Sequence, residues 1–178
     1  QVLSQDEIVH LFKAIDNKKH RLILMLIYSG GLRLSEACRL RRMDIHLDRG
    51  ELFIHAGKGA KDRYTTLSQN VVPLLQSYIS EYDPNYWLFE GQSGGAYSPR
   101  SVQAILRRAV QKSGVNPMAT VHTLRHSYAT HLLEQGVSLR HIQELLGHRS
   151  SKTTEIYTKV SNAERRRVRS PLDELGTI

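Results

Sequence analysis

The sequence contains one cysteine, Cys38, so the chain has no second thiol with which to form an internal disulfide. This scarcity is typical of proteins from reducing compartments, and we expect Cys38 to be a small core residue. Apolar runs are also short, because the longest, 22–28, is far below the roughly 20 residues that span a bilayer. No signal-peptide pattern opens the chain. These absences predict a cytoplasmic protein with no membrane segment.

The length suits one domain, and the charge is unevenly distributed along it. The formal net charge is +8 over 178 residues. Residues 1–98 hold 12 basic and 11 acidic side chains, whereas residues 99–169 hold 13 and 4. Such asymmetry favours a polyanionic partner such as nucleic acid, the alternative being an ordinary basic solvated surface. Because the chain begins at Gln1, without an initiator methionine and directly at a helix signal, we expect a further domain upstream.

Hydrophobic periodicity and capping residues predict a mainly helical chain. The predicted helices cover about 4–16, 18–28, 35–40, 68–82, 98–112, 122–136 and 139–147, with a last one in 162–168. Between 43 and 67 the pattern alternates around turn signals at 48–50 and 57–59, which predicts a small antiparallel meander. The segment 86–91 is expected to be a short strand or extended. The fold class is therefore mainly α with a small antiparallel β-sheet (α+β).

Two short motifs in the first half carry basic residues in unusual settings. In "SGGLRLSEACRL", Arg33 follows a Gly-Gly break, and Glu36 three residues on can brace its guanidinium. The alternative is a surface arginine in a helical ion pair. In "AGKGAKDR", Lys58 lies at the tip of the predicted hairpin, from which its ammonium could reach into a groove. The alternative there is a solvated turn lysine.

Two further motifs lie in the basic second half. In "HTLRHSYATHLL", His122 and Arg125 share a helical face and could address one oxygen-rich group. His122 and His126 could instead bind a metal, although the local sequence offers no third ligand. In "LLGHRSSKTTEIYTKV", His148 follows a helix-ending glycine, where it could simply answer the helix dipole. Tyr157 of the same motif could be a half-buried amphipathic side chain.

Taken together, these side chains are what a metal-free attack on a phosphodiester requires. Two guanidiniums can hold the non-bridging oxygens and stabilise the extra charge of the transition state. A tyrosine hydroxyl, with a reference pKa near 10, becomes a nucleophile when a base accepts its proton. A lysine can protonate the departing oxygen. The phosphotyrosine ester conserves the energy of the broken bond, so neither ATP nor Mg²⁺ is needed.

The four motifs, in this order over about residues 4–160, resemble the signature motifs of the tyrosine recombinase, or phage integrase, family. Within that family the chain is most similar to Xer-like and integron-type bacterial integrases, including its "SPLDEL" at 170–175. The resemblance implies the tyrosine recombinase catalytic-domain fold and a site-specific recombinase that forms a 3′-phosphotyrosyl intermediate without a cofactor. It implies the following roles: Arg33 and Arg125 clamp the phosphate, Lys58 is the general acid, His122 and His148 aid proton handling and phosphate binding, and Tyr157 is the nucleophile.

The resemblance also implies how the chain is organised. Residues 1–178 would be one catalytic domain, whose tail from about 161 to 178 docks in cis or on a neighbour, while the family's N-terminal DNA-clamping domain is absent. The partner would be double-stranded DNA in a bacterial cytoplasm, bound by four protomers through a Holliday junction, with no small-molecule substrate. The isolated domain would be a monomer.

Three other functions use similar residues. A type IB topoisomerase shares the tyrosine chemistry but relaxes supercoils without exchanging partners. A DNA-binding module without catalysis would use the same basic surface. A metal-dependent nuclease would lose its activity in excess chelator.

Overall fold

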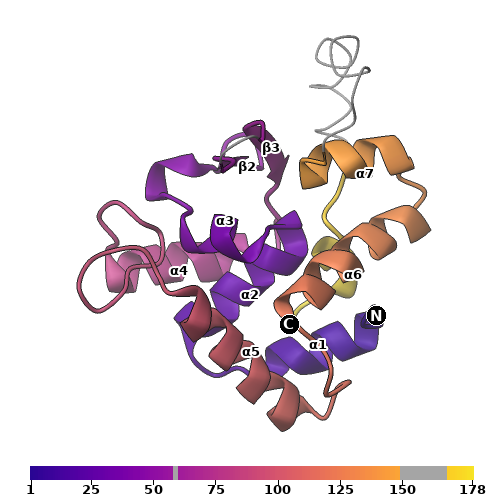
Figure 1. The fold of residues 1–178 in the computed structure, drawn as a ribbon, viewed down its shortest axis with the longest axis horizontal. Coiled ribbons are helices and arrows are strands. Elements are labelled where there is room, and N and C mark those ends of the chain that lie inside the picture. Colours follow the sequence, from indigo (N-terminus) through magenta and orange to yellow (C-terminus); the bar gives the residue numbers. More distant parts are fainter. Residues whose placement is uncertain (58–59, 149–167) are drawn as a thin grey trace.

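The computed structural model describes residues 1–57, 60–148 and 168–178 (Figure 1). Its helices are α1 (Gln5–Lys13), α2 (Lys18–Gly30), α3 (Leu34–Cys38), α4 (Val72–Tyr82), α5 (Pro99–Ser113), α6 (Val121–Glu134) and α7 (Leu139–Leu146), with 3₁₀ turns η1 (Arg42–Asp44) and η2 (Pro171–Leu175). Its strands are β1 (Ile45–His46), β2 (Glu51–Ile54) and β3 (Arg63–Thr66). The predicted fold class, mainly helical with a small antiparallel sheet, is confirmed.

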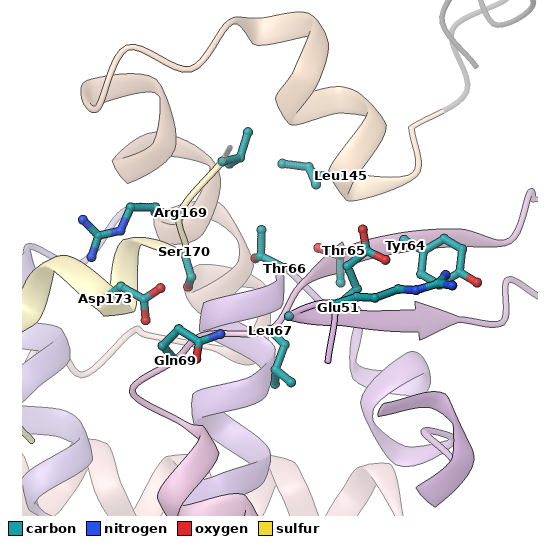
Figure 2. Close-up of a pocket in the computed structure, with 13 residues that line it drawn as sticks. Glu51, Tyr64, Thr65, Thr66, Leu67, Gln69, Leu145, Arg169, Ser170 and Asp173 are labelled. Carbon is teal, nitrogen blue, oxygen red and sulfur yellow. The ribbon is translucent and has the colours of Figure 1, made fainter. Parts of the chain in front are cut away.

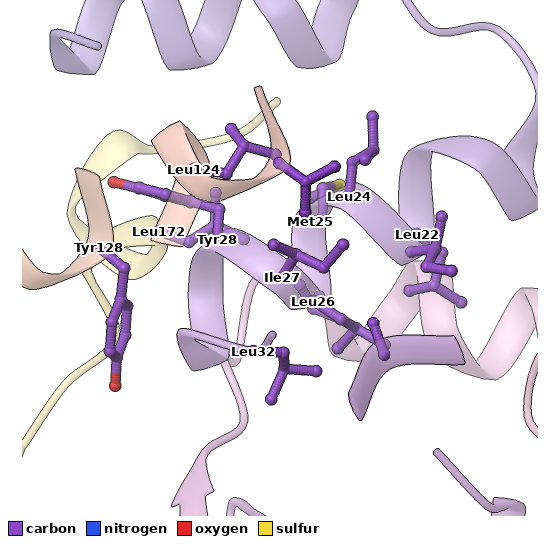
Figure 3. Close-up of a cluster of buried hydrophobic side chains, with 14 of the residues drawn as sticks. Leu22, Leu24, Met25, Leu26, Ile27, Tyr28, Leu32, Leu124, Tyr128 and Leu172 are labelled. Carbon is purple, nitrogen blue, oxygen red and sulfur yellow. The ribbon is translucent and has the colours of Figure 1, made fainter. Parts of the chain in front are cut away.

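Helix α2 is the centre of the core because nearly all of its faces are apolar. Every residue from 22 to 30 is buried, which is typical of a helix surrounded by others. It packs against α3, α4, α5 and α6. Figure 3 shows the side chains of α2 meeting Leu32, Leu124, Tyr128 and Leu172. The core thus joins the middle of the chain to its C-terminal segment.

The small sheet forms where the sequence alternates. Its strands run antiparallel in the order β1-β2-β3, with Ile45 paired to Leu52 and Phe53 paired to Tyr64. Leu52 and Ile54 point inward, and Gly50 takes the left-handed conformation that the first turn requires. Strand β3 packs against α7, and Figure 1 shows the sheet between α3 and α7. This brings the hairpin motif close to two other motifs.

Several predicted boundaries differ from the structure. Helix α4 begins at Val72, not near 68, because Pro73 lies in its first turn, where a missing N–H costs nothing. Helix α1 ends at Lys13 rather than at 16. The segment 86–91, predicted as a short strand or extended, instead bends at 86, 88 and 89 and makes only the isolated bridges Arg41–Trp87 and Glu90–Ala96. The helix predicted in 162–168 falls outside the described residues except at its last position.

The last eleven residues pack back onto the core. The Ser170 hydroxyl donates to the Ser29 carbonyl at 2.8 Å, and Leu172 is fully buried. Asn70 donates its side-chain amide to the Leu172 carbonyl at 3.0 Å. Cys38 is buried as expected. In the described part of the chain, every helix is too short or too polar to cross a membrane.

Candidate active site

Arg33 stands at the start of α3, where the chain leaves α2. Gly31 ends α2 in the left-handed conformation, and an added Cβ there would lie 2.5 Å from the Tyr128 ring. The close approach therefore requires glycine. Arg33 is the N-cap of α3; its N–H donates to Glu36 at 2.7 Å and its guanidinium donates to the same carboxylate at 2.9 Å. The predicted brace is confirmed, and the Arg33 side chain stays 40% exposed.

Glu36 is the negative centre of this region. Its side chain is only 6% exposed, and Arg63 donates to both of its oxygens at 2.8 and 2.9 Å. Burial alone would raise the pKa of Glu36, but the hydrogen bonds and charges of Arg63 and Arg33 outweigh burial and lower the pKa to about 2. Glu36 is therefore ionised at neutral pH, and Arg125 lies 4.0 Å from it.

Arg125 projects from α6 into the gap between two helix ends. Its guanidinium donates to the Gly31 carbonyl at the end of α2 and to the Leu146 carbonyl at the end of α7, the latter at 2.7 Å. Burial, together with the charges of Arg33 and Arg63, lowers the pKa of Arg125 to about 10, so it remains a cation at neutral pH. The side chain is held rigidly with its charge beside that of Arg33.

Two of the predicted histidines lie near these arginines. A capping box between Thr120 and Thr123 starts α6, which places the exposed His122 in its first turn. His148 follows Gly147, the left-handed cap of α7, and its N–H donates to the Gln143 carbonyl at 3.0 Å. Burial and then the charges of Arg125, Arg33 and Arg63 lower the pKa of His148. Its imidazole is therefore mostly neutral at pH 7 and able to accept a proton.

Three of the predicted site residues line one pocket of about 990 Å³. Arg33, His122 and Arg125 line it together with one face of α5, from which Gln103 and Arg107 project. The remaining lining is largely apolar and comes from Leu32, Leu34, α5 and the 114–121 segment. Arg107 is exposed, as are Arg100 and Arg108 of the same helix. The pocket thus combines fixed positive charge at one end with a long, partly apolar wall.

The other two predicted site residues, Lys58 and Tyr157, lie outside the described residues. Their roles, like those of the four described residues, stay predictions. Arg63 was not predicted from the sequence, although it is buried against Glu36, the partner of Arg33. The only local signal was a charged residue at the inward position of an alternating strand, on the same face as Thr65. A buried arginine needs a partner, and that partner, Glu36, is 27 residues away.

A second, smaller pocket of about 180 Å³ is lined by residues of β3, α7 and the terminal segment. Figure 2 shows Thr66 and Tyr64 of β3, Leu145 of α7, and Arg169 and Ser170 of the terminal segment around it. The four predicted site residues within the described ranges do not line it. This pocket marks the seam where the end of the chain meets the sheet.

His122 and His126, considered above as a metal pair, contact each other edge to face with ring centroids 4.4 Å apart. Burial and the neighbouring His122 lower the pKa of His126. Within residues 1–57, 60–148 and 168–178, no group of three or more His, Cys, Asp or Glu side chains is arranged to hold a metal ion.

Comparisons with known proteins agree with this geometry. The model of the Phage integrase family matches residues 1–164. The tyrosine recombinase XerA of Thermococcus kodakarensis is 42% identical over 167 residues, which cover 90% of this chain and 58% of that protein. The chain therefore spans a little over half the length of the curated relatives it matches.

Two solved structures have the same fold. The crystal structure of a XerA recombinase matches with a TM-score of 0.79 and 28% identity, over 90% of this chain and 65% of that one. The XerH site-specific recombinase, solved bound to its palindromic difH substrate after cleavage, matches with a TM-score of 0.75 and 28% identity. That match covers 92% of this chain and 51% of the XerH chain.

Proposed function

The chain belongs to the phage integrase family, and on that basis we propose that it is the catalytic part of a site-specific DNA recombinase. The observation that carries the proposal is the convergence of Arg33, Arg125 and His122 on one pocket. These residues come from two motifs about 90 positions apart in the sequence, and both motifs lie within the residues that the family matches. The proposed substrate is double-stranded DNA, and support comes from the structurally similar XerH site-specific recombinase, which was solved bound to its palindromic difH substrate.

The two arginines would hold the scissile phosphate. Arg125 is fixed by two main-chain carbonyls and Arg33 by Glu36, so both charges are in place before the substrate arrives. Pre-organised donors stabilise the extra negative charge of the five-coordinate phosphorus. Losing one such donor typically lowers the rate by about 10² to 10³. We expect that loss for Arg125→Ala.

The covalent step would use Tyr157, His148 and Lys58. The Tyr157 oxygen attacks phosphorus, and its proton passes to an imidazole; we assign this role to His148, whose lowered pKa leaves it neutral at pH 7. The bond from phosphorus to the 5′ oxygen breaks, and Lys58 donates a proton to that oxygen. The products are a 3′-phosphotyrosyl ester and a free 5′ hydroxyl. Attack by a 5′ hydroxyl of another strand reverses the step and completes strand exchange without ATP or a metal.

The basic face of α5 would lie along the DNA. Arg100, Arg107 and Arg108 are exposed on this helix, and Arg107 lines the pocket that holds the phosphate clamp. We extend the proposal to an assembly of four protomers on two DNA sites, in which the terminal segment docks on a neighbour. In the isolated chain, the 168–178 segment contacts its own core. Crosslinking on DNA with and without that segment would test the exchange.

A trapping experiment tests the function directly. The chain is incubated with a pool of nicked duplexes of varied sequence, in which the fragment carrying the 5′ hydroxyl diffuses away after cleavage. We expect an adduct that survives denaturing electrophoresis, forms equally in excess chelator, and disappears in Tyr157→Phe. The matched control is Tyr86→Phe, which alters an exposed tyrosine. An adduct that persisted in Tyr157→Phe would refute Tyr157 as the nucleophile. In a separate assay on supercoiled DNA, relaxation with no recombinant product would refute strand exchange between sites.

A further inference from the structure

Arg63 makes several contacts next to the site, and it has no role in the proposed reaction so far. It leaves the hairpin on β3 and binds both oxygens of Glu36 at 2.8 and 2.9 Å. Its Nε donates to the Leu145 carbonyl of α7 at 2.7 Å. The side chain is 6% exposed, so it contacts protein rather than solvent. One buried guanidinium therefore links the hairpin, the Arg33 turn and the end of α7.

The geometry of α7 is fitted closely around this guanidinium. Gly147 adopts a positive φ of 69°, and a Cβ added there would lie 2.9 Å from two atoms of Arg63. Only glycine lets the helix end approach so near. His148 is the next residue, so the position of its backbone depends on the same contact. Arg63 thus helps to fix the backbone position of His148, the proposed proton acceptor.

The charges explain why the contact matters for an anion. Three guanidiniums, those of Arg33, Arg63 and Arg125, surround the single carboxylate of Glu36. Without Arg63, the buried carboxylate would have to be compensated by the remaining two cations. Arg33 already touches it and Arg125 lies 4.0 Å away. Both cations would then move toward Glu36 and away from a phosphate.

We propose that Arg63 is a positioning residue of the cleavage site: by occupying both oxygens of Glu36 it leaves Arg33 and Arg125 available to a phosphate. Arg63 does not line the pocket and acts only through its neighbours. The inference rests on the proposed function for its consequence in catalysis. The effect of Arg63 on the binding of an anion does not depend on cleavage and can be measured without it.

Three variants separate positioning from folding. Arg63→Met removes the charge and keeps much of the volume, whereas Arg63→Lys keeps a charge that cannot bind both oxygens. The double variant Arg63→Met with Glu36→Gln removes the carboxylate that Arg63 neutralises. A purely structural loss at position 63 would not be repaired by changing Glu36. Thermal unfolding of each variant identifies any that fails to fold, and Arg63→Lys and the double variant then carry the test.

Two readouts make the outcome decisive. In single-turnover adduct formation at saturating DNA, misplacing the clamp in Arg63→Met should lower the rate about 10²-fold with little change in DNA affinity. The rate of Arg63→Lys should lie between those of the parent chain and Arg63→Met, and the double variant should recover a large part of the lost rate. In titrations with inorganic phosphate followed by NMR, the affinity should fall in Arg63→Met and return in the double variant.

The possible failures are distinguishable. If the parent chain binds phosphate in an Arg63-dependent way but forms no adduct, the positioning role stands and the proposed function fails. If the parent chain forms the adduct and Arg63→Met forms it at the same rate, the positioning role is wrong. It is also wrong if Arg63→Met is impaired, Glu36→Gln alone is not, and the double variant is no better than Arg63→Met.

Discussion

Replacement of Glu36 by glutamine should change how the stability of the chain depends on pH. The carboxylate is buried between Arg63 and Arg33, which lower its pKa from 4.5 to about 2. Each pKa unit corresponds to about 1.4 kcal/mol, so the ionised form contributes on the order of 3 kcal/mol to folding at pH 7. Because the pKa is lower in the folded state, this contribution is complete above about pH 4.5 and is lost as the pH falls toward 2.

Urea unfolding at a series of pH values from 6 down to 2.5 measures this effect. The parent chain should lose stability steeply below about pH 4.5, whereas Glu36→Gln should be less stable at pH 6 and should fall less on acidification. Asp48→Asn, which changes an exposed carboxylate, is the matched control and should follow the parent. If the difference between the parent chain and Glu36→Gln stayed constant over this range, Glu36 would not titrate as the structure requires, and the reasoning would be refuted.

Three further predictions concern the packing around the site. Gly31→Ala should lower the unfolding midpoint more than Gly114→Ala: both have positive φ, which costs about 1–2 kcal/mol, but only the first also places a Cβ 2.5 Å from a buried ring; equal losses would contradict this. Leu172→Ala should cost about 2–5 kcal/mol in urea unfolding because the side chain is fully buried, and a loss below that range would mean that the terminal segment is not part of the core. Tyr28→Phe should cost about 1–3 kcal/mol because it leaves the buried His131 without its 2.8 Å partner, and a neutral result would contradict that bond.

The parts of the fold that could be predicted from the sequence are those set by near neighbours. The end of α7 followed from Gly147 and the end of α2 was placed within two residues, at 28 instead of Gly30, while the Arg33–Glu36 brace followed from a spacing of three residues. The start of α4 was predicted too early because the residues just before it contact a distant part of the chain. Ser68, three residues before that helix's N-cap, contacts Asp173 in the terminal segment. A contact between residues 105 positions apart leaves no periodic trace in either segment.

The candidate site also contains residues that could be predicted from the sequence and one that could not. Residue types and motif order were sufficient to select Arg33, His122 and Arg125, which the structure brings to one pocket. Arg63 could not be selected, because its importance depends on two partners 27 and 82 positions away. Buried charge is decided by such long-range pairs, since a guanidinium is tolerated in the interior only where the fold supplies a carboxylate or carbonyl.

Arg125 is held by carbonyl oxygens of the main chain, which every amino acid possesses. A side-chain exchange at position 146 therefore cannot delete the acceptor there, whereas position 31 must stay glycine because an added Cβ would lie 2.5 Å from the Tyr128 ring and would shift the helix end. During sequence drift, the neighbours of this arginine can vary in chemistry as long as the backbone path is kept. For protein engineering, the same feature means that libraries at position 146 can explore size and shape while the orientation of this guanidinium is preserved.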